Sequence, residues 1–363
     1  MPRISWGSMW WYMKPEMRGV IRTVTGDIPP EQLGACQCHE HIYISGDRLG
    51  PHTPVRPIDD FACSAAELRD YAAAGGCALV DAQPQSCGGA VEVLRRLSAE
   101  TGVKIIASAG FHKLAFYRQD SAVMIDPEQA LARRFAAEIR QGAGIIKTAV
   151  DRDGISGRYC LLHAAAAAAA AETGAAVLCH VEQGASLMEL IAFYSFREIA
   201  PERLILCHAD RAVPDRGAHL AALREGVYLE YDTICRPKYH DDAQEAALIL
   251  YLLEKGYENQ LLMGLDTTRE RLTHYSRRDC LCSVGNFSGA SAAGLSYIRR
   301  QFLPLLRRSG AAARQLDLIM TKNPACALQL RLPENGEQFP SEYGEQPRRA
   351  AGMLQSQPAA ETK

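Results

Sequence analysis

The stretch "QCHEHIYI" (residues 37–44) places two histidines, His39 and His41, inside an apolar and β-branched run. Runs of this kind are typical of strands that are buried on both faces. Side chains at positions i and i+2 of a strand lie on the same face, so the two imidazoles are expected to point the same way. Such a pair is either two core histidines or half of a metal site.

Eight short apolar runs recur along the chain, and each is followed by a longer segment with helical character. Several of these helical segments begin at a polar cap residue and end at glycine. Regular alternation of strand and helix predicts a parallel sheet, and eight units favour a closed (β/α)8 TIM barrel over an open doubly wound sheet. The predicted strands span residues 34–44, 77–83, 104–112, 144–150, 176–182, 204–210, 227–233 and 261–267.

Polar residues that are able to bind a metal lie late in five of these runs. The C-terminal ends of the strands form the active-site face of such a barrel, so these side chains are expected to meet at one mouth. Imidazoles and a carboxylate suit zinc or a similar divalent metal. The residues concerned are His39, His41, Lys147, His180, His208 and Asp266.

Lys147 is the unusual member of this set, because a protonated lysine beside metal ions would be repelled. It is therefore either a base with a lowered pKa or a chemically changed side chain. Reaction with carbon dioxide would turn the amine into a carbamate, which offers a bridging carboxylate. That interpretation indicates two metal ions rather than one.

Composition limits the alternatives. The chain has 363 residues, 47% of them hydrophobic, and a formal net charge of −2, which argues against a charge-driven nucleic-acid partner. The twelve cysteines are scattered, with no CxxC pair, and no signal segment or membrane-spanning run is apparent, so we expect a cytoplasmic protein with free thiols. Residues 1–16 are expected to be an N-terminal extension, 17–331 the catalytic barrel, and 332–363 a polar, disordered tail.

A series of longer motifs extends this pattern over residues 20 to about 330, and there the chain resembles the phosphotriesterase family of the amidohydrolase superfamily. The resemblance also makes homodimers an expectation. The motifs, in chain order, are "IRTVTGDIPPEQLGACQCHEH" (21–41), "SAGFHKLAFY" (108–117), "GIIKTAV" (144–150), "CHVEQG" (179–184), "CHADR" (207–211), "DTICRPKY" (232–239), "GLDTT" (264–268) and "KNPACAL" (322–328).

The resemblance implies a role for each of the six residues. His39, His41 and Asp266 would bind the more buried metal, and His180 and His208 the more exposed one. Carbamylated Lys147 and a hydroxide would bridge the two ions, with Zn²⁺ expected and Mn²⁺ or Co²⁺ as alternatives. Asp266 is the expected proton acceptor.

The remaining histidines and cysteines have plainer interpretations. A single histidine is more often a hydrogen-bonded core residue than a ligand, and we assign His163, His219 and His274 in this way. The cysteines that directly precede ligands are expected to pack on the opposite face of their strands, because side chains alternate along a strand. These are Cys38, Cys179 and Cys207.

Seven loop residues are the candidates for substrate binding. Several cations around one mouth favour an anionic substrate, although any single charged loop residue could merely face solvent. The candidates are His112, Tyr117, Arg211, Arg236, Lys238, Tyr239 and Arg269.

Family members with a comparable set of loop residues are similar to lactonases that act on phosphorylated sugar lactones. A neutral phosphotriester would require an aromatic pocket, whereas only 7% of the residues here are aromatic. The favoured activity is therefore hydrolysis of a lactone or carboxylic ester of a small anionic molecule.

Two alternatives stay open. One is a phosphotriesterase or phosphodiesterase with the same metals. The other is a barrel that binds a metal or ligand without turnover, against which the intact ligand set argues. The route of the proton is also open, since Asp210 is a candidate and His240 lies too far beyond its strand to be assigned.

Overall fold

The computed structural model describes residues 19–50, 53, 55–212, 215–282 and 293–331. The predicted extension, residues 1–16, and the predicted tail, residues 332–363, lie outside this range. No helix in the described ranges is both long enough and apolar enough to cross a membrane. The strands are β1 (Ile21–Thr23), β2 (Gly26–Ile28), β3 (Cys36–Glu40), β4 (Ala78–Pro84), β5 (Lys104–Gly110), β6 (Ala143–Val150), β7 (Val177–Val181), β8 (Leu204–Cys207), β9 (Tyr228–Tyr231) and β10 (Leu261–Met263).

The helices follow the strands in near-regular alternation, as the periodicity of the sequence predicts. Two π-helical turns, at residues 298–302 and 318–322, precede α10 and α12. The α-helices are α1 (Phe61–Ala73), α2 (Val91–Thr101), α3 (Ala122–Ile125), α4 (Glu128–Arg140), α5 (Arg158–Thr173), α6 (Leu187–Phe196), α7 (Arg216–Arg224), α8 (Asp242–Glu254), α9 (Thr273–Cys282), α10 (Leu303–Arg308), α11 (Ala313–Asp317) and α12 (Asn323–Ala327).

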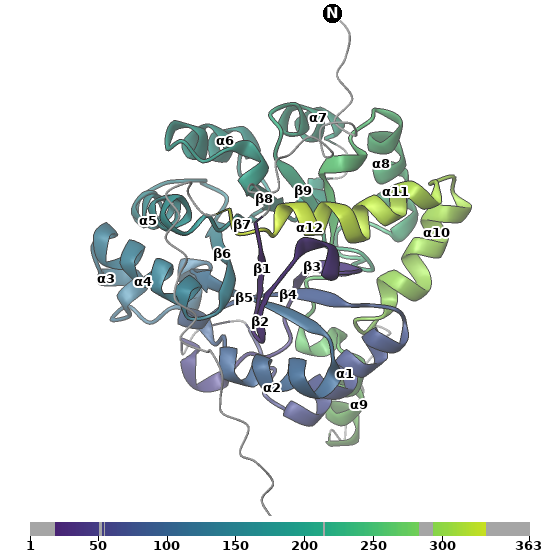
Figure 1. Cartoon of the computed structure of the whole chain (residues 1–363), viewed down its shortest axis with the longest axis horizontal. Helices are drawn as coiled ribbons and strands as arrows, with labels where there is room; N and C mark the ends of the chain where they lie inside the picture. Colours follow the sequence, from purple (N-terminus) through teal and green to yellow (C-terminus); the bar gives the residue numbers. More distant parts are fainter. Residues whose placement is uncertain (1–18, 51–52, 54, 213–214, 283–292, 332–363) are drawn as a thin grey trace, which may run out of the picture. The chain divides into compact units, whose positions relative to one another are not determined.

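Eight strands form one parallel sheet in the order β10-β9-β8-β7-β6-β5-β4-β3, and the helices surround it (Figure 1). Each of these strands falls inside one of the eight predicted runs or extends past it by a single residue. The predicted (β/α)8 TIM barrel is therefore confirmed.

Polar residues cap several of the helices. The side chains of Asp60, Ser186 and Asp241 each accept a hydrogen bond from a backbone N–H in the first turn of α1, α6 and α8 respectively. Gly102 and Gly174 end α2 and α5 in the left-handed conformation, which glycine adopts without steric cost. Local capping signals in the sequence thus fix where these helices begin and end.

The seam between β3 and β10 closes the barrel. The backbone N–H of Asp266 donates to the carbonyl of His39 at 2.9 Å. The Glu40 side chain accepts from the N–H of Leu265 and from the Thr267 hydroxyl, both at 2.9 Å. Burial raises the pKa of Glu40 to about 7 against the effect of these donors. Closure of the barrel therefore places His39 and Asp266 side by side.

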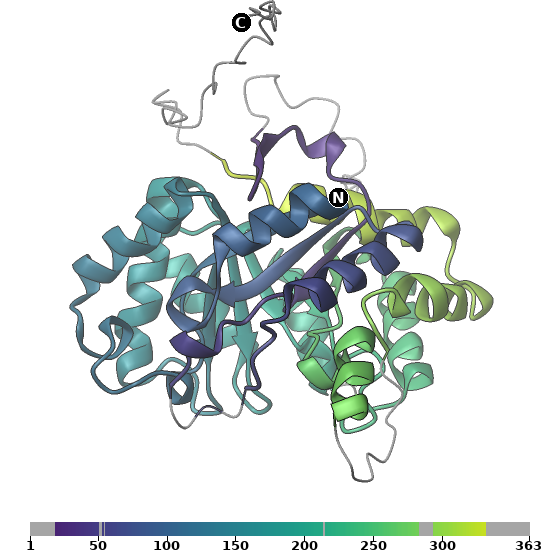
Figure 2. The ribbon, with the colours of Figure 1, turned by 90° about the horizontal axis from the view of Figure 1, so that it is seen from below.

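The opposite end of the barrel is covered by apolar side chains. Ile21 from β1 and Leu328, just after α12, pack in one core cluster with Leu178 and Ile205 of the barrel strands. Figure 2 shows the β1–β2 hairpin and α12 at one end of the strands and α9 at the other. Apolar side chains therefore fill the interior from this end, and the polar side chains of the site lie at the carboxyl ends of the strands.

One expectation about the cysteines is wrong. Cys179 packs in the layer between strands and helices, as expected, but Cys38 and Cys207 pack inside the barrel. The pairing of β3 with β4 is irregular, and His208 has a φ of 60°, so strict alternation fails at both places. Each of these cysteines and the histidine that follows it can then both face inward. Every cysteine whose side chain is described is free.

The seam generates a stability prediction. Replacing Thr267 by valine removes the hydroxyl that donates to Glu40 and accepts from the N–H of His41 at 3.1 Å. We expect the free energy of unfolding, measured by urea denaturation, to fall by about 1–3 kcal/mol, because two buried partners lose their bond. The same change at Thr101, whose hydroxyl donates to Leu97 at the half-buried end of α2, should cost less. If the two variants lose the same free energy of unfolding, the hydrogen bonds of the seam stabilise the fold no more than an ordinary bond at a helix end.

Candidate metal centre

The first half of the site is built from β3, β6 and the segment after β10. Lys147 is completely buried in β6, and its Nζ lies 3.0 Å from Nε2 of His39. Oδ1 of Asp266 lies 3.3 Å from Nε2 of His41 and 3.8 Å from Nε2 of His39. These nitrogen and oxygen atoms converge from three parts of the barrel on one point.

The second half of the site comes from β7 and the end of β8. Nδ1 of His180 lies 2.7 Å from Nε2 of His208. The ring centres of His208 and His39 are 4.9 Å apart, so the two halves form one continuous group. The structure thus brings together all six residues that the sequence assigned to the metals.

Two of these residues have an unusual backbone. His208 has a φ of 60° and Asp266 a φ of 44°, in the left-handed region that residues other than glycine seldom adopt. Each lies just after the end of its strand, where the turn of the chain redirects the side chain toward the mouth. Strain of this kind persists only where the surroundings enforce it, and it clusters at functional sites.

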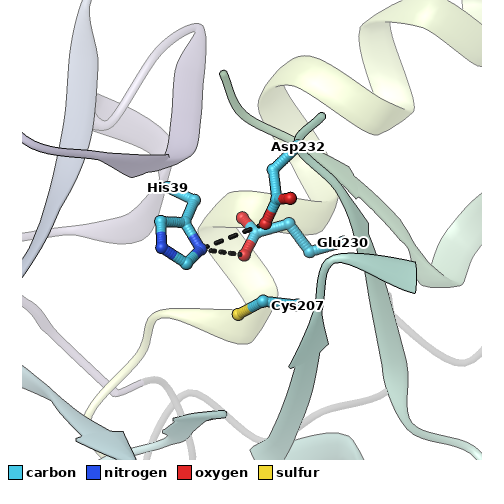
Figure 3. A group of neighbouring side chains, drawn as sticks. All are labelled: His39, Cys207, Glu230 and Asp232. Atoms are coloured by element: carbon cyan, nitrogen blue, oxygen red, sulfur yellow. Dashed lines mark hydrogen bonds and ion pairs between the residues drawn. The ribbon is translucent and has the colours of Figure 1, made fainter. Parts of the chain in front are cut away.

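Two buried acids, Glu230 in β9 and Asp232 just after it, lie beside His39 (Figure 3). Nδ1 of His39 lies 3.1 Å from Glu230 and 3.1 Å from Asp232. Asp232 also accepts from Nδ1 of His208 at 2.6 Å and from the backbone N–H of His208 at 3.2 Å. When Nδ1 of a histidine donates to a carboxylate, Nε2 keeps its lone pair for a metal.

Sequence reasoning missed Glu230 and Asp232. Their signal was present, since two acids at alternate positions of the otherwise apolar run "VYLEYDT" must share a face of a buried strand. Burial raises the pKa of both carboxyl groups. A positive charge on the other side of the histidines would offset this cost.

The donor set fits two divalent cations. Burial lowers the pKa of His39 to about 4 and of His180 to about 3, so both imidazoles are neutral near pH 7 and have a lone pair to offer. Nδ1 of His41 and Nε2 of His180 have no hydrogen-bond partner among the described residues. Neutral imidazoles with one carboxylate are the ligands that Zn²⁺ and similar ions prefer.

Two guanidinium groups hold Asp266 from the outer side. Nη1 of Arg236 lies 3.0 Å and Nη2 of Arg211 3.5 Å from Oδ2 of Asp266, and Arg236 also donates to the backbone carbonyl of Asp266. Burial opposes ionisation of Asp266, but Arg236 and the neighbouring histidines bring its pKa well below the usual range. These contacts favour the ionised carboxylate of Asp266, and both predicted arginines lie at the site.

The other predicted substrate residues divide into three groups. His112 is buried at the site, with its ring centre 5.3 Å from that of His180. Tyr117 lies behind it, since its hydroxyl accepts from the N–H of His112 at 2.9 Å and bonds to Ser86. Tyr117 thus supports the site from the core.

Lys238 and Tyr239 lie in the loop after β9. The Lys238 side chain is exposed, and its Nζ lies 5.1 Å from the centre of the Tyr239 ring. The guanidinium of Arg211 lies 5.0 Å from the same ring, so Tyr239 joins Lys238 to the centre. The lysine head group is free to meet an anion at the mouth.

Arg269 has different partners. Its guanidinium binds Asp279 at 2.9 Å and the carbonyl of Pro57 at 2.8 Å, and it lies 4.8 Å from the centre of the Tyr275 ring. These contacts join the loop after β10 to the loop after β3. In the structure Arg269 therefore connects two loops and contacts none of the six metal-site residues.

Glu182 was missed by the sequence reasoning, although "CHVEQG" places it two residues after His180. It is half-buried; its carboxylate binds Nζ of Lys113 at 2.7 Å and lies 3.7 Å from Arg211 and from Nε2 of His180. The His180 and Lys113 side chains hold its pKa well below the usual value, despite partial burial. This fixed anion therefore lies among the cations of the mouth.

The arrangement of Asp232 generates a prediction about metal affinity. Replacing Asp232 by alanine removes the acceptor for His39 and His208 together, so we expect metal affinity, measured by chelator competition, to fall about 10- to 100-fold. Asp151→Ala is the matched control, because Asp151 pairs with Lys113 at the rim and with none of the six ligands. If Asp232→Ala retains full affinity, Asp232 does not orient the ligands.

Comparison with known proteins agrees with this geometry. The phospho-furanose lactonase of Mycoplasmopsis synoviae is 29% identical over 84% of this chain and 90% of its own. The N-acetyltaurine hydrolase of Danio rerio is 25% identical over 85% of this chain and 97% of its own. A crystal structure of a lactonase from Listeria monocytogenes superposes with a TM-score of 0.76 and 26% identity, covering 86% of this chain and 99% of that one. The family model of the phosphotriesterase family matches residues 19–328, so the chain is a hydrolase that belongs to this family.

Proposed function

We propose that the protein is a metal-dependent lactonase that hydrolyses a phosphorylated sugar lactone or a similar anionic carboxylic ester. The observation that carries this proposal is the juxtaposition of a buried metal-ligand set with Arg211, Arg236 and Lys238 at one mouth. The ligand set supplies the means to attack a carbonyl group. The cations supply a site for a charged group on the same substrate.

The names of the relatives support this substrate class. The relatives from Mycoplasmopsis synoviae and Mycoplasmopsis agalactiae are called phospho-furanose lactonases, and those from Danio rerio and Tetraodon nigroviridis are called N-acetyltaurine hydrolases. Each of these names describes a molecule with a hydrolysable carbonyl group and a strongly acidic group, phosphate or sulfonate. An anion at some distance from the reacting carbonyl is therefore common to both.

The ligands divide between two cations. We assign His39, His41 and Asp266 to the more buried ion and His180 and His208 to the more exposed one. Lys147 would bridge them as a carbamate. Zn²⁺ is the proposed ion, with Mn²⁺ or Co²⁺ as alternatives, because neutral imidazoles dominate the donor set. When bound, two such ions polarise a carbonyl oxygen and lower the pKa of water toward neutrality.

The chain's own residues then hold the reactants. Asp266 accepts the proton of the attacking water, because it is the one carboxylate in direct contact with both His41 and the arginines. His112, whose pKa is lowered by burial and by Lys147, is a neutral group beside the substrate. Lys238 and Arg236 bind the remote anionic group, so binding energy far from the carbonyl fixes its orientation.

The proton needs a route away from Asp266. Asp210, the candidate from the sequence, accepts from the N–H of Thr233 at 2.6 Å and lies in a group with His240 and Glu245. Arg211 and Arg236 occupy the outer side of Asp266 instead. We infer that the proton leaves through water at the mouth and not through a buried side-chain relay.

A substrate test follows from the position of Lys238. Replacing Lys238 by methionine should raise KM for a furanose lactone 5-phosphate about 10-fold or more, with little change for the unphosphorylated lactone, because one charged contact is lost. The measurement is proton release during lactone hydrolysis. Lys255→Met is the matched control, since Lys255 also lies over a tyrosine ring, at 5.3 Å, but at the C-terminal end of α8 and away from the mouth.

The result decides between activities. Equal rates for the two lactones would rule out phosphate recognition by these loops. Turnover of phosphate esters without turnover of lactones would replace the proposal with a phosphoesterase that uses the same centre.

Lys147 provides a test of the bridging ligand. Lys147→Ala should lose bound metal and at least about 100-fold in rate, because one ligand of both ions is removed. Reconstitution of metal-free wild-type protein should need carbon dioxide and be slow in buffer freed of it. Lys104→Ala, at the start of β5, should behave as wild type. Full activity and metal content in Lys147→Ala would overturn the bridging assignment.

A further inference from the structure

A second group of ligand-capable side chains lies behind Asp232, outside the centre described above. It consists of Asp210 just after β8, His240 in the loop after β9, and Glu245 in the first turn of α8. One ligand atom of each lies within 4.8 Å of the others. All three residues are buried, and both acids are completely so.

In the part of the chain that the structure describes, no lysine or arginine forms an ion pair with either carboxyl group. Oδ1 of Asp210 and both oxygens of Glu245 have no hydrogen-bond partner among the described residues. The basic side chain that contacts Glu245 is that of His240, whose Nδ1 lies 3.6 Å from Oε2 of Glu245. The charged group that acts most strongly on Glu245 is Asp210, followed by Asp242 and Asp232, and all three are acids. Burying unpaired carboxylates in this way is costly unless a cation joins them.

The ligand atoms of the group lie close to one another. Asp210 uses its second oxygen, Oδ2, to accept from the N–H of Thr233 at 2.6 Å, which leaves Oδ1 available. His240 bonds through Nε2 to the Thr233 hydroxyl at 2.9 Å. Its Nδ1 faces Glu245 and is 3.3 Å from the backbone carbonyl of Asp241. Two carboxylates and one imidazole are a donor set that suits a divalent ion such as Zn²⁺ or Mn²⁺.

We propose that Asp210, His240 and Glu245 bind a third divalent cation, separate from the two of the catalytic centre. This ion joins the end of β8, the loop after β9 and the start of α8. The loop after β9 carries Arg236 and Lys238, so the ion holds the anion-binding loop in place. Its role is structural, since none of its ligands contacts Asp266 or the substrate mouth.

The test counts bound metal on the full-length protein. Wild type and Glu245→Gln are each loaded with Zn²⁺, and in parallel with Mn²⁺, and freed of loose metal by gel filtration. Metal content is measured by mass spectrometry. Glu138→Gln is the matched control, because Glu138 is also a buried helical glutamate but is paired with Arg134 and the N–H of Gly110.

We expect Glu245→Gln to bind about one equivalent of metal per protein molecule fewer than wild type. Glu138→Gln should bind as much metal as wild type. The same difference should appear in a Lys147→Ala background, so the count does not depend on the catalytic centre or on any activity. Equal metal contents with both ions would overturn the proposal and leave a carboxyl pair that shares a proton.

A second measurement does not depend on any variant. Crystals of the loaded wild-type protein, measured at the absorption edge of the metal, should show an anomalous peak between the three side chains. His240→Gln should abolish that peak. Peaks confined to the histidine centre would also refute the third site.

Discussion

The Asp232 carboxylate contacts two histidines from different parts of the barrel, and the geometry of the centre depends on it. It accepts a hydrogen bond from His208 and lies 3.1 Å from Nδ1 of His39. By holding Nδ1 of His39 and His208, it turns both Nε2 atoms toward the mouth. Glu230 adds a second acceptor for His39. Because these acids are buried, ionising them requires positive charge nearby, which links the fold of the interior to the binding of cations.

The interior of the barrel has an apolar end and a polar end. Apolar side chains such as Leu178 and Ile205 fill the end beneath the β1–β2 hairpin, and the polar residues lie at the carboxyl ends of the strands. At two of these ends the backbone turns into the left-handed region, at His208 and Asp266. The closure of β10 on β3 then joins the first and last ligands of the chain.

Charges around the mouth are arranged in layers. Arg211 and Arg236 contact a metal ligand directly, whereas Lys238 stands farther out above Tyr239. Glu182 lies among them and binds Lys113. A negatively charged group that enters the mouth would meet Lys238 first, and Arg236, which also holds Asp266, lies closer to the centre. Arg269 binds Asp279 and connects the loop after β10 to the loop after β3.

The sequence by itself determined the barrel and predicted which six residues meet at its mouth, because strand periodicity and the position of a residue within each run are local properties. It did not determine what lies around them. Cys38 and Cys207 face inward through irregular backbone, Arg269 turns to another loop, and Asp210, His240 and Glu245 meet only because three elements pack together. Such contacts join residues far apart in the chain, and only the tertiary structure decides which side chains share a space and which charges are left to be neutralised.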